Sequence, residues 1–170
     1  MAWYLDWTYR KTFSFNNASA DYQTKILVGE SAGAVGEEVD CNSNCLTTFN
    51  DLRFTGADGS TLIDYFIESI SGATPNQLAT IWVQNTAAGD ATGCMYYGKA
   101  GAAAVSNGTN TFIVFDDFER GVDGDTVGGS WTEVTAHIHI STEKEYTGIA
   151  ANTRSMKLIG GAGNPTLLLQ

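Results

Sequence analysis

"FNDLRFTGADGSTLIDYFIES", residues 49–69, is the stretch that decides the fold. Leu52 and Phe54 alternate with polar residues before the turn sequence GADGS, and a second alternating run follows it. A period of two is typical of β-strands, and Asp-Gly is a strong signal for a turn between antiparallel strands. The stretch therefore predicts a strand, a turn and a second strand, each strand with one apolar face and one polar face.

The charged residues of this stretch allow two interpretations. Asp51 and Arg53 alternate with apolar neighbours, so the pattern places them on an outward, solvated face. A catalytic pair would need two carboxylates that converge in a cleft, and alternation along a strand does not establish convergence. The pattern favours the solvated face, and we expect that the protein is not an enzyme.

The same period of two recurs elsewhere in the chain. Residues 7–15, WTYRKTFSF, place Trp7, Tyr9, Phe13 and Phe15 on one side of a strand. Further strands are predicted in the segments YQTKILVGE, ATIWVQNT, GCMYYGK and TFIVFDDF. Short strands at this spacing, with Gly and Asn turns between them, predict an all-β protein, an antiparallel, jelly-roll-like β-sandwich.

Composition limits the classes of function. The chain has 170 residues, 43% of them hydrophobic, and a formal net charge of −10. This apolar fraction suffices for a sizeable core, while the negative charge would repel nucleic acid. No apolar run approaches the roughly 20 residues of a membrane span. We therefore expect no nucleic acid partner and no membrane insertion.

Several motifs in one order carry a family resemblance. They are W-x-YRK, DCNSNC, F-x-DLRFT-x-x-DGSTLIDYFIES, IWV, MYYGKA and SNGTNTFIVFDDFE, within residues 3–119. In this order they resemble a family of domains of unknown function, numbered 2341, found in large secreted and surface proteins of bacteria, archaea and their viruses. The resemblance implies a β-sandwich that is often set beside laminin-G or concanavalin-like lectin domains. It implies no established activity and no catalytic residues.

The remainder of the chain resembles the opening strands of a concanavalin A-like jelly roll. FDDFE, Trp131 and SMKLIGG carry this second likeness. We therefore expect a β-sandwich domain over residues 1–110 and an incomplete jelly roll over residues 111–170. Such a sandwich needs eight or more strands, and this segment supplies about four. We expect it to be completed by further sequence or by a neighbouring subunit, in a homo-oligomer or a larger chain.

Cys41 and Cys45 occupy the polar segment CNSNC. This spacing lacks the second ligand pair of a zinc site, and in an oxidising setting it permits a disulfide. Cys94 lies in an apolar strand and is expected to remain a free, buried thiol. We predict a disulfide between Cys41 and Cys45.

Carboxylates gather in DDFERGVDGD, a segment that includes Asp117, Asp123 and Asp125. The segment does not meet the twelve-residue EF-hand pattern. Lectin-like sandwiches often carry structural calcium, and a divalent cation would relieve the repulsion between these carboxylates. A solvated acidic turn is the default interpretation of this segment, and calcium is the cofactor predicted for it if it binds one.

Three aromatic residues are the candidates for a sugar-binding platform: Trp131, Tyr96 and Tyr97. Flat aromatic faces suit pyranose rings, while Trp7 and Trp82 lie in apolar strand contexts and are expected in the core.

We expect an extracellular, cell-surface or virion protein that binds glycans or neighbouring subunits. The alternatives are a virion structural protein, such as a capsid decoration or tail-fibre component, and an accessory module of a glycoside hydrolase. No secretory signal pattern follows Met1, which favours the virion alternative.

Overall fold

The computed structural model describes residues 4, 6–15, 19–85, 89–119 and 121–125, together with the backbone of four strands between 131 and 169. The chain divides into two compact units, Met1–Phe115 and Asp116–Gln170. The boundary expected from the sequence lies a few residues earlier, after residue 110. Each unit is described by itself.

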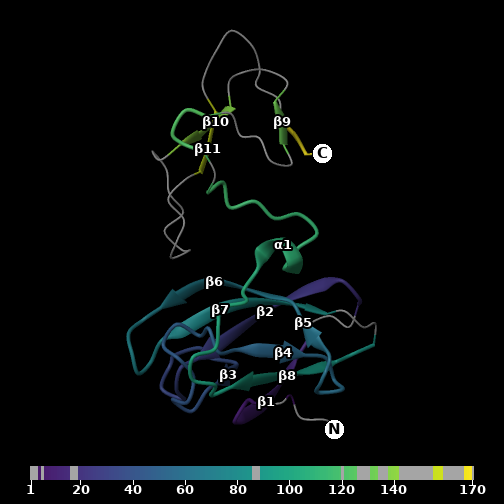
Figure 1. Ribbon diagram of the computed structural model, residues 1–170, viewed down its shortest axis with the longest axis vertical. Coiled ribbons are helices and arrows are strands. Elements are labelled where there is room, and N and C mark those ends of the chain that lie inside the picture. The colour runs from purple at the N-terminus through teal and green to yellow at the C-terminus, as the bar shows by residue number, and fades with distance from the viewer. Residues whose placement is uncertain are drawn as a thin grey trace. The chain divides into compact units, whose positions relative to one another are not determined.

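The first unit consists of two four-stranded sheets packed face to face (Figure 1). Sheet A has the strand order β1 (Tyr9–Ser14), β8 (Thr92–Tyr97), β4 (Arg53–Thr55) and β5 (Leu62–Ile63). Sheet B has the order β3 (Val39–Asp40), β2 (Tyr22–Gly29), β7 (Leu78–Asn85) and β6 (Tyr65–Ser71). Neighbouring strands are antiparallel except β2 and β3, which are parallel. The predicted all-β sandwich is confirmed.

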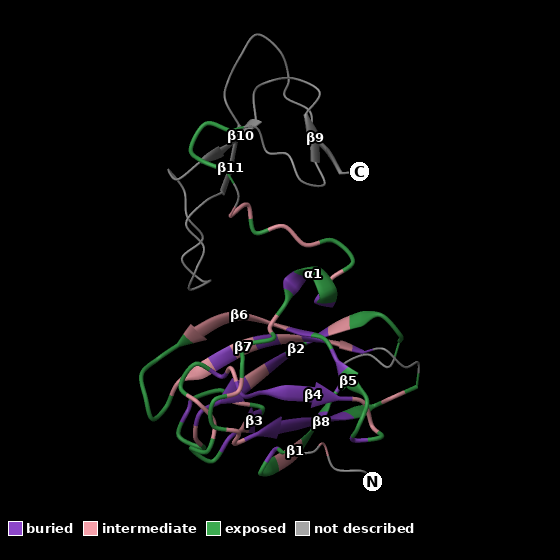
Figure 2. Ribbon diagram, viewed as in Figure 1, coloured by how far each residue is buried: buried purple, intermediate pink, exposed green. Residues whose placement is uncertain are grey.

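Alternate residues of both sheets point into the space between them and form the core, which is purple in Figure 2. Phe13 of β1 lies 5.6 Å from Phe54 of β4, and Phe54 lies 5.0 Å from Tyr65 of β6, measured between ring centroids. Gly93 stands opposite Phe13 in the register, and a side chain there would collide with the Phe13 ring. The strand predicted from WTYRKTFSF is confirmed as β1, but Trp7 precedes the strand and packs with Tyr96 in a separate cluster instead of beside Phe13 in the main core.

The chain passes from sheet A to sheet B within the stretch at residues 49–69. β4 pairs with β5 across the GADGS turn, as predicted, with Phe54 opposite Ile63. β6 begins at Tyr65, directly after Asp64, and pairs instead with β7 in sheet B. The second predicted strand is thus divided between the two sheets, and its apolar residues Ile63 and Tyr65 both enter the core.

An ion pair links the two sheets at the edge of the sandwich that lies opposite β5 and β6. β1 and β3 are the edge strands there, one in each sheet. Lys11 Nζ of β1 lies 2.9 Å from Asp40 Oδ2 of β3, and both side chains are partly exposed. A charge on an edge strand also discourages pairing with other chains.

Aromatic residues cover the outer face of sheet B, the face that points away from sheet A. The helix α1 (Gly108–Thr111) contacts β6 and β7, and the rings of Phe112 and Phe115 pack on Phe66. Trp82 meets Phe112 at 5.8 Å, so Trp82 belongs to this outer layer and not to the core. The strand predicted from TFIVFDDF is wrong, because α1 ends at Thr111 and residues 112–118 form no strand.

The second unit contains four short strands in two antiparallel pairs. β9 (Trp131–Glu133) pairs with β12 (Leu167–Leu169), and β10 (Ile138–Ser141) pairs with β11 (Ser155–Leu158). The described strands of this unit therefore form two separate two-stranded sheets. In the described parts of both units, no helix is long and apolar enough to cross a membrane.

Candidate ligand-binding groove

A row of three side chains lies on the outer face of sheet A, the face that points away from sheet B. Arg10, Tyr96 and Arg53 are direct cross-strand neighbours on β1, β8 and β4. The Arg10 guanidinium lies over the Tyr96 ring, 5.8 Å from its centroid, and donates to the Tyr96 hydroxyl at 3.3 Å. This hydrogen bond raises the pKa of Arg10 above its ordinary value. The row therefore places two positive charges beside one aromatic ring.

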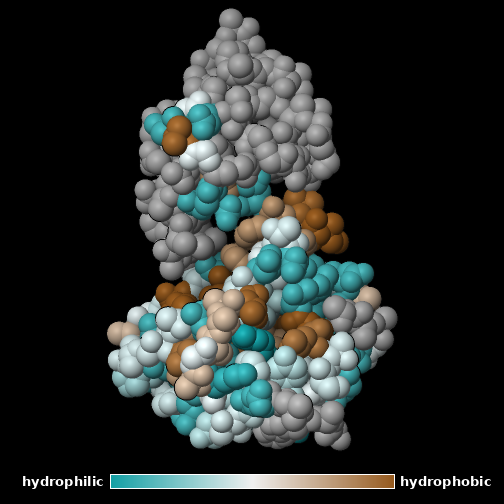
Figure 3. Space-filling model, in the orientation of Figure 1, coloured by the Kyte–Doolittle hydropathy of each residue, from teal (hydrophilic) through white to brown (hydrophobic). Residues whose placement is uncertain are grey.

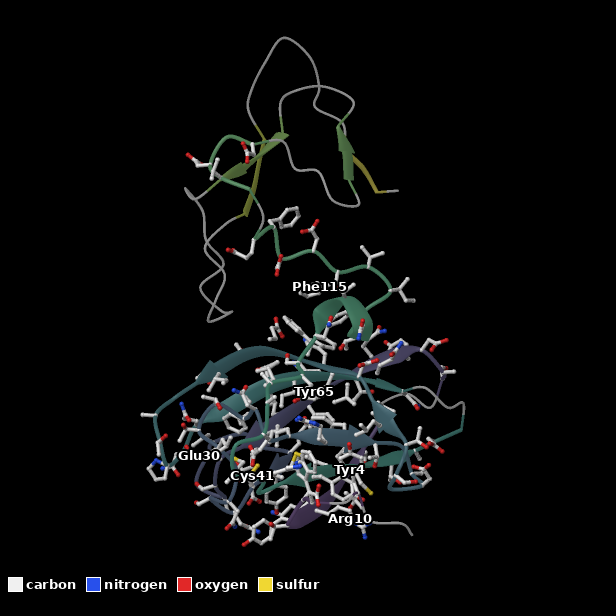
Figure 4. The ribbon with its side chains drawn as sticks, in the orientation of Figure 1. Tyr4, Arg10, Glu30, Cys41, Tyr65 and Phe115 are labelled. Atoms are coloured by element: carbon white, nitrogen blue, oxygen red, sulfur yellow. The ribbon has the colours of Figure 1, made fainter. Side chains whose placement is uncertain are left out.

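Tyr4 and Trp7, which precede β1, cover Tyr96 in this row. The Tyr4 ring packs against Trp7 at 5.0 Å and against Tyr96 at 5.9 Å. Trp7 Nε1 donates to the backbone oxygen of Asp51 at 2.6 Å, which fixes the indole over the start of β4. Figure 4 shows Tyr4 and Arg10 on this side of the sandwich, whereas Tyr65 lies between the sheets. A second small apolar cluster thus forms outside the main core.

The loop after β8 closes the other side of the row. Gly98 N donates to Asp51 Oδ2 at 2.8 Å, and Ala103 O accepts from Arg53 Nη2 at 2.9 Å. Gly98 has a φ of +85° and packs against the Tyr9 ring, so glycine is required at this position. The loop brings Lys99 over Trp7, with Nζ 4.3 Å from the ring centroid.

Between the N-terminal segment and this loop lies a groove of about 720 Å³, here called the outer groove. It is lined by Tyr4, Asp6, Trp7, Arg53, Ser60, Leu62, Lys99 and Val105. Its size is in the range of sites that bind small molecules. A smaller pocket of about 170 Å³ shares Arg53, Leu62 and Val105 with it, so the hollow extends toward β5.

The outer groove combines an aromatic wall with polar groups. Tyr4 is half-buried, so part of its ring is accessible, while Trp7 is buried beneath Lys99. The Lys99 ammonium lies 3.6 Å from the exposed carboxylate of Asp6, and Ser60 is also exposed. Half-exposed Leu62 and Val105 supply apolar surface. This arrangement is suited to a ligand with both a flat apolar face and polar substituents.

The burial of Asp51 and Arg53 corrects the expectation that both are solvated. They are 1% and 8% exposed. Asp51 Oδ1 accepts from Leu46 N at 2.9 Å and its Oδ2 from Gly98 N, while the Arg53 guanidinium donates to backbone carbonyls. The alternation correctly assigns Arg53 to the outward face, but distant segments cover that face.

The predicted sugar platform is not formed by Tyr96 and Tyr97. Tyr96 is fully buried under Tyr4, and its hydroxyl donates to Gly59 O at 2.6 Å. Tyr97 is 2% exposed, points into the core and stacks on Tyr9. Adjacent strand residues face opposite ways, yet both faces of β8 are covered, so neither ring is presented to a ligand. The side chain of Trp131 lies outside the described residues.

The acidic segment forms local turns. Asp117 Oδ1 accepts from Glu119 N at 3.0 Å, and Asp125 Oδ2 accepts from Val122 N at 2.8 Å, while Asp123 is exposed. Within the described ranges, no three His, Cys, Asp or Glu side chains come close enough to hold a metal ion. Calcium binding at Asp117, Asp123 and Asp125 stays a prediction.

Cys41 and Cys45 are thiols in this structure, as is Cys94. The hydrogen bond between Cys41 and Cys45, followed by burial, raises the pKa of Cys41 well above its ordinary value. Asn42 and Ser43 between them have φ values of 48° and 60°, so the segment turns tightly and brings the two side chains together. Their oxidation to a disulfide stays a prediction.

Sequence reasoning did not identify Tyr4, Asp6 and Lys99 as site residues. One signal was available, since the segment WYLDW at residues 3–7 holds three aromatic residues beside a carboxylate. Its position over sheet A depends on the Trp7–Asp51 hydrogen bond, which joins residues 44 positions apart. Local patterns carry no information on such a contact.

The fold and the groove define the first unit as a two-sheet β-sandwich module with a ligand-sized hollow on one outer face. Residues 48–134, half of the chain, match the model of the family described as Domain of unknown function (DUF2341). The chain belongs to this family. The match begins after β1, β2 and β3, although β2 is a central strand of sheet B, so the folded unit reaches beyond the matched segment. No curated protein and no solved structure matches the chain.

Proposed function

We propose that the protein is a non-enzymatic recognition module that binds a glycan in the outer groove, on an exterior surface of a cell or virion. The observation that carries this proposal is the half-buried Tyr4 ring in the groove wall, beside Asp6, Ser60 and Lys99. A pyranose ring has an apolar C–H face that packs on an aromatic ring, and hydroxyls that bond to charged and polar groups.

The lining of the outer groove supports binding over hydrolysis. Glycoside hydrolysis uses two carboxylates that flank the bond to be cleaved. The described lining of the outer groove contains one carboxylate, Asp6. The buried carboxylate of Asp51 accepts two backbone N–H groups and acts as a structural link between loops. A bound glycan is therefore expected to keep its length during prolonged incubation with the protein.

Screening the full chain on a glycan array tests this proposal, with Tyr4→Ala and Tyr22→Ala as matched variants. Tyr22 is 50% exposed on β2 in sheet B, far from the outer groove in the strand order. Binding should be lost in Tyr4→Ala and kept in Tyr22→Ala. The proposal would be contradicted if the chain bound no glycan, or if the Tyr4→Ala variant bound glycan as well as the unmodified chain.

A second candidate function is subunit assembly. Ile113 and Val114, directly after α1, are 83% and 50% exposed, and Figure 3 shows hydrophobic surface beside α1. Adjacent exposed apolar residues are typical of interfaces between proteins. Light scattering should then show an oligomer that Ile113→Ser dissociates, and a monomer at high concentration would remove this candidate.

The proposed concanavalin A-like continuation concerns the second unit. The support for it is the likeness of FDDFE, Trp131 and SMKLIGG, and the two pairs of strands between residues 131 and 169. Under this proposal the two pairs belong to one larger sandwich completed by additional strands. Hydrogen exchange over residues 155–170 tests it, because unpaired strand edges exchange rapidly.

A further inference from the structure

Positive charge is concentrated at the outer groove, although the first unit is acidic overall. Residues 1–115 contain eleven acidic and five basic residues. Three of the five basic residues, Arg10, Arg53 and Lys99, lie on the outer face of sheet A around Tyr96 and Trp7. Arg53 and Lys99 line the groove itself. Asp6 is the carboxylate of the groove lining, so the two positive side chains there outnumber the negative one.

The Arg53 charge is not neutralised by a described carboxylate. Its Nη1 donates to Asn50 O at 3.0 Å and its Nη2 to Ala103 O at 2.9 Å, and both acceptors are uncharged. Asp40 pairs with Lys11 and Asp6 pairs with Lys99, so neither carboxylate is an ion-pair partner of Arg53. The Arg53 guanidinium is 8% exposed and paired with neutral carbonyls, and an anion is attracted more strongly in such a setting of reduced dielectric constant than in water.

Lys99 has a partner that a ligand can replace. Its Nζ lies 3.6 Å from Asp6 Oδ2, and the Asp6 side chain is 77% exposed. An exposed ion pair of this length contributes little to stability. The Trp7 ring holds the ammonium in the groove independently of Asp6, through the 4.3 Å contact. A ligand carboxylate can therefore bind Lys99 at small cost.

We propose that the ligand of the outer groove is an acidic sugar, whose carboxylate binds near Lys99 and Arg53 and whose ring packs on Tyr4. This inference rests on the proposed glycan-binding function and adds the class of ligand. The carboxylate meets the two positive charges, and the hydroxyls of the ring have Ser60 and Asp6 as partners. A neutral sugar has no carboxylate to pair with the Arg53 charge. An acidic peptide has the carboxylates but lacks a pyranose ring to pack on the Tyr4 ring.

The test is an array that carries uronate- and sialate-containing glycans, neutral glycans of the same length, and poly-L-glutamate, probed with the full chain. We expect acidic glycans to bind about tenfold or more tightly than neutral ones, and to bind less tightly as salt increases. Lys99→Gln should weaken acidic-glycan binding about fivefold or more. Lys25→Gln, on β2 of sheet B, is the matched control and should leave binding unchanged.

The possible outcomes separate the two proposals. Equal binding of acidic and neutral glycans, or unchanged binding by Lys99→Gln, overturns the acidic-sugar inference and leaves the glycan-binding function standing. Poly-L-glutamate that binds as tightly as the acidic glycans also overturns the inference, because charge alone would then suffice. If no glycan binds at all, both proposals fail.

Discussion

Trp7 Nε1 donates a hydrogen bond of 2.6 Å to the backbone oxygen of Asp51, 44 residues along the chain. This contact holds the N-terminal segment over β4 and so places Tyr4 and Asp6 at the outer groove. Since Asp51 also binds Leu46 N and Gly98 N through its carboxylate, this one residue connects three segments around the groove. The groove therefore depends on contacts between distant parts of the sequence.

Trp7→Phe should reduce both stability and ligand binding. The substitution keeps an aromatic ring but removes the N–H donor, and the buried Asp51 carbonyl loses its partner. We expect the free energy of unfolding to fall by about 1–3 kcal/mol, measured by urea denaturation. Tyr22→Phe, at a 50% exposed position, is the control and should change it by less than about 0.5 kcal/mol. Equal effects of the two substitutions would show that the Trp7 hydrogen bond is unimportant.

Asp51→Asn should destabilise the first unit strongly. The amide replaces one acceptor oxygen with an NH₂ group that faces a backbone N–H, either Leu46 N or Gly98 N. A buried donor without a partner costs about 1–3 kcal/mol. Asp64→Asn is a suitable control because Asp64 is exposed. Denaturation curves that coincide for the two variants would contradict the structural role assigned to Asp51.

Alternation in the sequence predicts β1, β2, β7 and β8, which coincide with predicted segments, but it does not predict β3. It also assigns Leu52 and Phe54 to the core side of their segment correctly. It does not predict that Asp51 and Arg53 are buried. A period of two gives the face on which a residue lies, but not whether a distant loop covers that face.

The TFIVFDDF segment shows a different limit. Its β-branched and aromatic residues have high strand propensity, yet Phe112 and Phe115 pack on Phe66 of sheet B instead. Burial of these rings decides the local structure, and strand propensity largely reports such packing. The groove residues Tyr4 and Lys99 were missed for a related reason, because their proximity arises from the tertiary fold.

Asp58 should titrate at unusually low pH. The N–H of Ser60, the hydroxyl of Thr61 and the N–H of Thr61 bind its carboxylate and lower its pKa to about 2. Because the folded pKa is below the unfolded value of about 3.9, these bonds stabilise the fold above pH 4. That stabilisation is lost as the pH falls from about 4 to 2. Carbon NMR of the carboxyl group should give a midpoint near 2, and a midpoint near 4 would contradict the hydrogen-bonded turn.

Asp58→Ala provides the matching stability measurement. This variant should lose less stability than the original chain between about pH 4 and pH 2, because it lacks the group whose protonation breaks the turn. An identical acid dependence of Asp58→Ala and the unmodified chain would indicate that the turn contributes nothing.

Cys41 and Cys45 should form a disulfide with oxidised glutathione. The thiolate is the attacking species, and the raised pKa of buried Cys41 keeps it protonated near neutral pH. We therefore expect half-buried Cys45 to form the mixed disulfide first and Cys41 to displace glutathione slowly, faster at higher pH. Mass spectrometry should show a final loss of two hydrogen atoms, with Cys94 still a thiol. Three thiols after prolonged oxidation would contradict this prediction.

The most direct test of glycan recognition compares two of the four indole N–H signals, those of Trp7 and Trp82, which lie on opposite outer faces of the sandwich. Trp7 lies in the outer groove, whereas Trp82 lies on sheet B, where its Nε1 donates to Glu68 at 2.8 Å. An NMR titration of the full chain with the acidic glycan that binds best on the array should shift the Trp7 signal and leave the Trp82 signal in place. A shift of Trp82 alone, or no shift of either signal at saturating glycan, would contradict binding in the outer groove.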